Sequence, residues 1–181
     1  MHRDQVWELC KTIAPPYAFE PILILAICEQ ESRDPQNPLE YRDRAARLEQ
    51  GFYINYVERE NLATTSEILL ASSYGLTQMM GLSLRAVGYF DWWFAEQTAP
   101  MQTFLGNPFS EIAIPKAINA YMINPPWQVE RGCMWLKKKR EKTGGDAVKM
   151  LRYWNGDISG AKHYAEDVLG RRDKLRGIYL M

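Results

Sequence analysis

The sequence predicts a mainly α-helical protein, a single domain of about seven to nine helices with little or no sheet. Apolar residues recur with the 3.6-residue period of a helix along much of the chain, whereas alternating strand patterns are scarce. The length of 181 residues is that of about one domain. No repeat, low-complexity segment or linker interrupts the chain, so we assign residues 1–181 to one domain.

Prolines and glycines mark where the predicted helices end. The first helix covers about residues 3–13 and ends at Pro15-Pro16, and the second covers about residues 19–32 and ends before Asp34-Pro35. Later helices are predicted over about residues 68–71 (after a capping-box spacing at 64–67), 76–87, 112–123, 129–142 and 147–154, with a last helix after Ser159. We expect helical pieces and loop over residues 39–63.

The formal net charge is zero, but the charges are unevenly distributed. Residues 1–130 carry 9 Lys and Arg against 16 Asp and Glu, whereas residues 131–181 carry 13 against 6. This basic end is typical of a solvated helix face, or of a surface that attracts an anionic polymer such as nucleic acid or an acidic cell wall. A nucleic-acid binder would need a recognisable reading motif beside the charge. We find none and expect no nucleic-acid partner.

The three cysteines, Cys10, Cys28 and Cys133, are far apart, and the chain has only two histidines. A Cys/His cluster with zinc spacing is therefore excluded, and we predict no metal, no cofactor and reduced thiols in the core or at the surface. The apolar run 22–28 is too short to cross a bilayer, so we expect no stable membrane insertion. Residues 1–11 lack the apolar segment of a signal peptide, which predicts synthesis in the cytoplasm.

The second predicted helix carries the sharpest candidate for chemistry. Ile24, Ile27 and Glu31 fall at positions i, i+3 and i+7, so Glu31 continues the apolar stripe. Glu29 lies about 200° round the helix from Glu31 and is expected to face solvent. A carboxyl group at the rim of an apolar face is partly desolvated, and desolvation favours the protonated form that a general acid for glycosidic cleavage needs. The alternative is a solvated carboxylate at a helix end.

Two further motifs follow Glu31-Ser32 in order. The first is Ser73-Tyr-Gly-Leu-Thr-Gln-Met-Met-Gly81, and the second is Tyr153-Trp-Asn-Gly156 with Tyr164 on the next predicted helix. Together they resemble the lysozyme-like lytic transglycosylases of the soluble type, whose pattern is Glu-Ser, Gly-Leu-Met-Gln, Tyr-Asn-x-Gly and a Tyr-containing helix. The resemblance covers about residues 19–81 and 127–170. It implies a lysozyme-like fold with an inserted segment at about 33–63.

The resemblance implies roles for the acid and for three residues around it. Glu31 would protonate the glycosidic oxygen and later act as the base. Trp154 stands where the family has Tyr, so it would keep an aromatic platform without the hydroxyl. Asn155 would hold the acetamido sugar, and Tyr164 would orient the Glu31 carboxyl group. The structural alternatives are a helix cap for Asn155-Gly156 and core packing for Tyr164.

Three residues of the middle motif would line the sugar site beside the acid, namely Ser73, Gln78 and Met79. The alternative for Gln78 is an exposed polar residue of a helix. The motif departs from the family at two positions, because Thr77 stands where Met is usual and Gly81 where Pro is common. The fold implied by the resemblance is unaffected by these departures, whereas the subsite preferences depend on them.

The implied activity is cleavage of the β-1,4 bond between N-acetylmuramic acid and N-acetylglucosamine in peptidoglycan glycan strands. Lytic transglycosylases use one carboxyl group, and the 6-hydroxyl of the sugar attacks to give a 1,6-anhydro product. A hydrolytic muramidase commonly uses two carboxylates, and Glu40, Glu58 or Glu60 in the inserted segment could supply the second. The third alternative is a lysozyme-like domain that binds the wall without cleaving it.

The size, the absence of a signal peptide and the absence of wall-binding repeats predict a monomeric bacteriophage endolysin. Such a protein would be released by a separate membrane-permeabilising protein and would act on the cell wall of the host, held there by the basic end of the chain. A phage tail-associated lysin and a bacterial wall-remodelling enzyme are the alternatives.

Overall fold

The structure is a computed structural model that describes residues 1–43, 46–48, 65–154 and 161–180. Over these residues it has ten α-helices and one three-stranded sheet, and 68% of the described residues are helical, which confirms the predicted mainly α fold. None of the described helices has both the length and the apolar character needed to cross a membrane. The chain divides into two compact units, residues 1–42 with 129–181 and residues 43–128.

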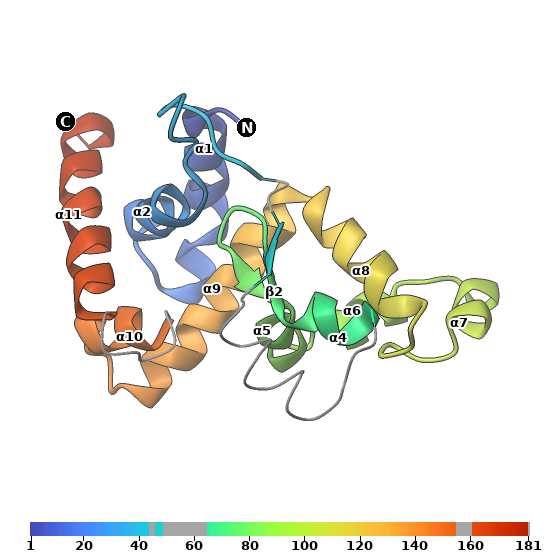
Figure 1. Cartoon of the computed structure of the whole chain (residues 1–181). Helices are drawn as coiled ribbons and strands as arrows, with labels where there is room; N and C mark the ends of the chain where they lie inside the picture. The colour runs from blue at the N-terminus through green and yellow to red at the C-terminus, as the bar shows by residue number, and fades with distance from the viewer. Residues whose placement is uncertain (44–45, 49–64, 155–160, 181) are drawn as a thin grey trace. The chain divides into compact units, whose positions relative to one another are not determined.

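The first unit is built from helices at the two ends of the chain. It contains α1 (Arg3–Ile13), the 3-10 helix η1 (Pro15–Tyr17), α2 (Pro21–Ser32), most of α9 (Pro125–Lys142), α10 (Ala147–Trp154) and α11 (Ala161–Tyr179). Both α1 and α11 pack against α2, and Figure 1 shows α2 between them. The predicted bounds of α1 and α10 are confirmed, and the last predicted helix extends to residue 179.

Helix α2 is the central helix of the first unit and is buried on nearly every side. Pro21 begins it, where the missing N–H group would have no helical partner. All seven residues from 22 to 28 are buried, and Ser32 closes the helix by donating from Oγ to the carbonyl of Cys28 at 2.8 Å. A helix that is apolar all round has no solvent face. The expectation that Glu29 faces solvent is therefore wrong, because its side chain is only 11% exposed.

The three cysteines meet in the core of the first unit. Cys10 on α1, Cys28 on α2 and Cys133 on α9 are fully buried and form no disulfide. Burial raises the pKa of Cys10 and of Cys133, and the neighbouring Cys28 raises the pKa of both further. Both groups are therefore protonated thiols at neutral pH, as the prediction of reduced core thiols requires.

The second unit surrounds a small antiparallel sheet. It contains β1 (Ala46–Leu48), α4 (Thr65–Leu70), β2 (Ser72–Tyr74), β3 (Met79–Met80), α5 (Gly81–Ala86), α6 (Tyr89–Ala95), α7 (Ala99–Leu105), α8 (Ala113–Met122) and the start of α9. The strand order is β1-β2-β3, and Tyr74 lies opposite both Ala46 and Met79. The prediction of a helix over 76–87 is wrong for residues 76–80. Gly75 and Gln78 have φ values of 73° and 45°, which a right-handed helix excludes.

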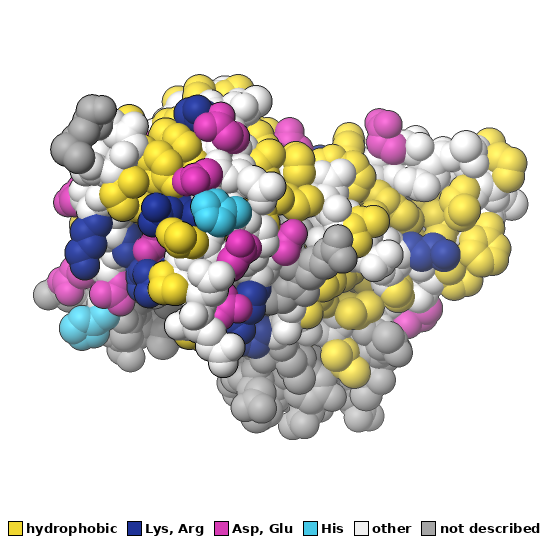
Figure 2. Space-filling model, turned by 90° about the horizontal axis from the view of Figure 1, so that it is seen from above, with side chains coloured by type: hydrophobic (Ala, Val, Ile, Leu, Met, Phe, Trp, Pro, Cys, Tyr) yellow, Lys and Arg dark blue, Asp and Glu magenta, His cyan; other side chains and the backbone are white. Residues whose placement is uncertain are grey.

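Helix α7 and the loop after it expose apolar side chains. Met101, Phe104, Phe109 and Ile112 are all exposed, and Figure 2 shows hydrophobic side chains gathered over this end of the second unit. The guanidinium of Arg85 lies 4.7 Å from the centroid of the Phe109 ring. Exposed apolar side chains concentrated in one place are characteristic of surfaces that contact other molecules.

A buried glutamine on the first turn of α9 joins several segments of the second unit. Gln128 is fully buried, and its Oε1 accepts a hydrogen bond from the backbone N–H of Leu76 at 2.7 Å. Its Nε2 donates to the carbonyls of Asp43, Met122 and Tyr121 at 2.9, 2.9 and 3.2 Å. This one side chain therefore satisfies four backbone groups from three separate segments.

Replacing Gly75 by alanine is expected to lower the free energy of unfolding by about 2 kcal/mol or more. Gly75 has φ 73°, and a Cβ atom there would lie 2.4 Å from Oε1 of Gln128. The control is Gly88→Ala, because Gly88 has φ 70° but nothing within 4 Å of the position that its Cβ atom would take. Urea unfolding of both variants separates the two costs. Equal losses would mean that only the backbone conformation matters.

Candidate active site

Glu31 lies on the last turn of α2, and its side chain is partly exposed. The hydroxyl of Tyr164 on α11 donates to Oε1 of Glu31 at 2.5 Å. The indole Nε1–H of Trp154 on α10 donates to the same oxygen at 3.3 Å. Trp154 and Tyr164 follow Glu31 by 123 and 133 positions in the chain, and the fold of the first unit brings both donors to one carboxyl oxygen. Two converging donors hold that carboxyl group in one orientation.

Tyr164 is placed by the buried face of α11 and is itself 9% exposed. Burial, and then the adjacent Glu31 carboxyl group, raise the pKa of Tyr164 well above its usual value. The hydroxyl therefore stays protonated at neutral pH and acts as the donor, while the Glu31 oxygen accepts. This is the geometry that an orienting role for Tyr164 requires.

Trp154 makes a contact that the motif resemblance does not indicate. The resemblance implies an aromatic platform that has lost the hydroxyl of the usual Tyr. The indole N–H supplies a hydrogen-bond donor in place of that hydroxyl, and it is directed at Glu31. Helix α10 ends at Trp154, and its buried residues Met150 and Leu151 fix the helix in the core. A sequence signal for the contact is that Trp, like Tyr, carries one donor on an aromatic ring.

Several candidate residues lie outside the described residues, namely Asn155, Glu58 and Glu60. Glu40 is described, and its Oε2 lies 3.3 Å from the N-terminal ammonium group of Met1. Of the three carboxylates proposed as a second catalytic group, Glu40 is therefore already engaged in an ion pair.

The middle motif forms the β2–β3 hairpin of the second unit. Ser73 and Met79 are buried, whereas Gln78 is partly exposed. Gln78 lies in the turn rather than on a helix, and its Nε2 donates to the carbonyl of Gly75 at 2.8 Å. Of the three residues predicted to line the sugar site, Gln78 is the one whose side chain reaches the surface.

The two departures from the middle motif have physical roles within the second unit. Thr77 is buried, and its Oγ1 donates to the carbonyl of Gln128 at 3.1 Å, which a methionine cannot do. A Cβ atom on Gly81 would lie 2.6 Å from Cα of Leu70 and 2.7 Å from the carbonyl oxygen of Leu69. Helix α5 therefore begins too close to α4 for any side chain.

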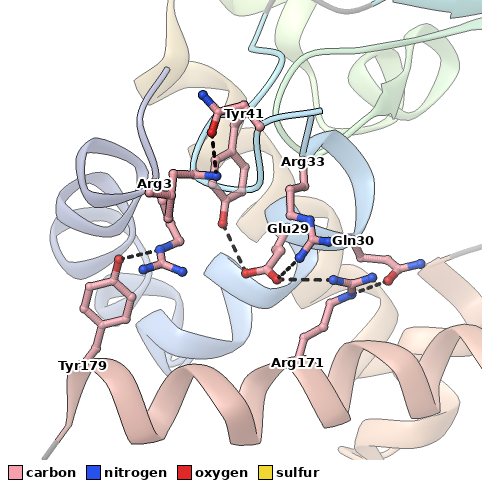
Figure 3. Close-up of polar contacts among 9 residues, drawn as sticks. Arg3, Glu29, Gln30, Arg33, Tyr41, Arg171 and Tyr179 are labelled. Carbon is pink, nitrogen blue, oxygen red and sulfur yellow. Dashed lines mark hydrogen bonds and ion pairs between the residues drawn. The ribbon is translucent and has the colours of Figure 1, made fainter. Parts of the chain in front are cut away.

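Glu29 is the centre of a polar cluster between α2 and α11 (Figure 3). Its Oε1 accepts hydrogen bonds from Nη1 of Arg33 and Nη1 of Arg171, both at 3.2 Å. Its Oε2 accepts from the Tyr41 hydroxyl at 3.4 Å, and Nε of Arg171 donates to Oε1 of Gln30 at 2.6 Å. Sequence reasoning missed this cluster, because the partner on α11 is 142 residues from Glu29.

Comparisons with models of known protein families, with curated proteins and with solved structures each gave no match. The functional interpretation therefore rests on the sequence motifs and on the geometry around Glu31.

Proposed function

We propose that this protein cleaves the β-1,4 bond between N-acetylmuramic acid and N-acetylglucosamine in peptidoglycan, as a lytic transglycosylase with Glu31 as acid and base. The observation that carries the proposal is the convergence of the Tyr164 hydroxyl and the Trp154 indole N–H on Oε1 of Glu31. These residues belong to the first and last of the motifs that resemble the family.

The proposed reaction needs one carboxyl group and no water. In the first step the proton of Glu31 passes to the glycosidic oxygen as the bond from that oxygen to C1 breaks, and the N-acetyl oxygen of the same sugar bonds to C1. In the second step the 6-hydroxyl oxygen attacks C1 and displaces the N-acetyl oxygen. Glu31 accepts the hydroxyl proton and is restored as an acid. Tyr164 and Trp154 stabilise the carboxylate between the two steps.

The carboxylates close to Glu31 in sequence support a mechanism with a single acid. Hydrolysis by two carboxylates requires a second carboxyl group that faces the sugar. Glu29 is engaged with Arg33 and Arg171, and Glu40 is engaged with the terminal ammonium group. A mostly buried carboxylate held by two arginines, as Glu29 is, is poorly suited to that task, whereas Glu58 and Glu60 lie outside the described residues.

The test is mass analysis of the sugar fragments that the protein releases from purified peptidoglycan. Transglycosylation gives 1,6-anhydro products that are one water lighter than hydrolysis products. Full-mass fragments with reducing ends would instead indicate a muramidase, with Glu58 and Glu60 as the next candidates. If several wall types released no fragments, the protein would be a binding domain.

Replacing Tyr164 by phenylalanine should lower kcat about 10- to 100-fold. The variant loses a hydrogen bond to a charged group, worth about 1.5–3 kcal/mol, and each 1.36 kcal/mol is a factor of ten in rate. Tyr179→Phe is the control, because the Tyr179 hydroxyl donates to Asp4 at 2.6 Å near the far end of the same helix. Rates of fragment release measure both. A similar loss in the two variants would refute an orienting role for Tyr164.

A further inference from the structure

Arg171 and Tyr164 lie on the same face of α11. They are seven positions apart, which is about two turns of helix, so both side chains reach α2. Tyr164 holds Glu31, and Arg171 holds the two residues before it, through Nε to Gln30 at 2.6 Å and Nη1 to Glu29 at 3.2 Å. Figure 3 shows one guanidinium reaching both side chains. Two side chains of helix α11 therefore hydrogen-bond to three consecutive residues of the last turn of α2.

The hydrogen bonds of Arg171 fix the position of α11 along α2. Its planar guanidinium donates two hydrogen bonds in a fixed geometry, which restricts both rotation and sliding of one helix along the other. Glu29 is 11% exposed and Arg171 is 31% exposed, so water competes only weakly for the ion pair. Arg33 and Tyr41 hold Glu29 from the side of α2 and of the chain that follows it.

The ion pair at the other end of the same two helices is different. Arg176 of α11 donates from Nη2 to Oε2 of Glu20 at 2.6 Å, but these side chains are 40% and 57% exposed. Exposed pairs of this kind contribute little to structure. The two arginines therefore form a matched pair for experiment, since both join α11 to α2 and only one lies beside Glu31.

We propose that Arg171 is a positioning residue for Glu31, which sets the register of α11 on α2 that brings the Tyr164 hydroxyl to the Glu31 carboxyl group. The catalytic consequence rests on the proposed function, whereas the register is a property of the fold. Hydrogen bonds weaken beyond about 3.2 Å, so a shift of about 1 Å between the helices would remove the contact between Tyr164 and Glu31. Misplacement on that scale can cost a large part of the rate.

The test is a double-mutant cycle of Arg171→Met and Tyr164→Phe. Arg171→Met should lower kcat about as much as Tyr164→Phe with little change in KM, and the double variant should be no slower than either. Arg171→Lys keeps the positive charge but loses the planar guanidinium that donates two hydrogen bonds, and it should recover part of the rate. Arg176→Met should stay within about twofold of wild type. Losses that multiply in the double variant, or an equal loss in Arg176→Met, would overturn the proposal.

A second readout does not depend on cleavage. The ¹³C resonance of the Glu31 side-chain carboxyl can be followed against pH in the folded protein. Arg171→Met should move the midpoint of this titration in the same direction as Tyr164→Phe, and the double variant should move it no further. An unmoved midpoint in Arg171→Met overturns the positioning role, even if cleavage is normal. A folded wild type that releases no fragments would contradict only the proposed function. Arg171→Lys carries the comparison if Arg171→Met does not fold.

Discussion

Replacing Glu31 by glutamine is expected to abolish peptidoglycan cleavage, with a fall in kcat of about 10³-fold or more. An amide can neither give an acidic proton to the glycosidic oxygen nor accept one from the 6-hydroxyl. General acid or base catalysis contributes about 10²–10⁴-fold to a step, and here one residue serves both steps. The amide has the same shape and its oxygen can still accept from Tyr164, so the fold should persist. Fragment release and thermal unfolding measure the two effects.

The control for this loss is Glu20→Gln. Glu20 precedes the first turn of the same helix and is likewise bonded to α11, through Arg176 at 2.6 Å, but it lies at the opposite end of α2. We expect its activity to stay within about twofold of wild type. If Glu31→Gln kept about a tenth of the wild-type rate, another group would have to supply the proton, and the single-acid mechanism would be wrong.

Replacing Gln128 by methionine is expected to cost about 3–5 kcal/mol of unfolding free energy. Methionine has a similar length and no hydrogen-bonding group of comparable strength, so little cavity is created. The cost comes from removing the partner of the Leu76 N–H and of the Asp43 and Met122 carbonyls, at about 1–3 kcal/mol for each buried group left unsatisfied, whereas the Tyr121 carbonyl still accepts from the N–H of Asn124. The thermal midpoint should fall by roughly 10 °C or more.

Gln102→Met is the control, because it makes the same Gln-to-Met substitution at a side chain whose hydrogen bonds water can replace. Gln102 also donates to two carbonyls, those of Phe94 and Ala95 at 3.2 and 3.3 Å, but it is partly exposed and water can replace it. Its cost should stay below about 1 kcal/mol. If Gln128→Met were equally mild, the four contacts of Gln128 would not be what holds the segments of the second unit together.

The helices that could be predicted are those whose ends are marked by residues close by in the sequence. In the sequence, residues 3–13 are followed closely by Pro15-Pro16 and residues 147–154 directly by Asn155-Gly156, so chain-local rules predict both helices. The turn at residues 75–78 could not be predicted this way. Its conformation depends on Gln128, more than fifty positions away, whose side chain binds the N–H of Leu76 and leaves room only for glycine at position 75.

In the candidate site, too, some residues could be predicted from the sequence and others could not. Motif order alone brings Glu31 and Tyr164 to notice, and the fold places them together. Helical periodicity misjudged Glu29, because it assumes one buried face and α2 is buried on nearly every side. The donor role of Trp154 and the contacts of Arg171 depend on how α10 and α11 cross α2. Helix crossings are set by packing of whole surfaces, which a reading of local motifs does not contain.

The three buried thiols make opening of the first unit measurable by chemical modification. All cysteines of the chain belong to that unit, and none is exposed. A thiol reagent in solution can therefore modify them only when the first unit opens, so the modification rate reports that opening alone. Gln128→Met weakens the second unit without touching a thiol. Its effect on the modification rate would measure whether the two units open independently or as one cooperative structure.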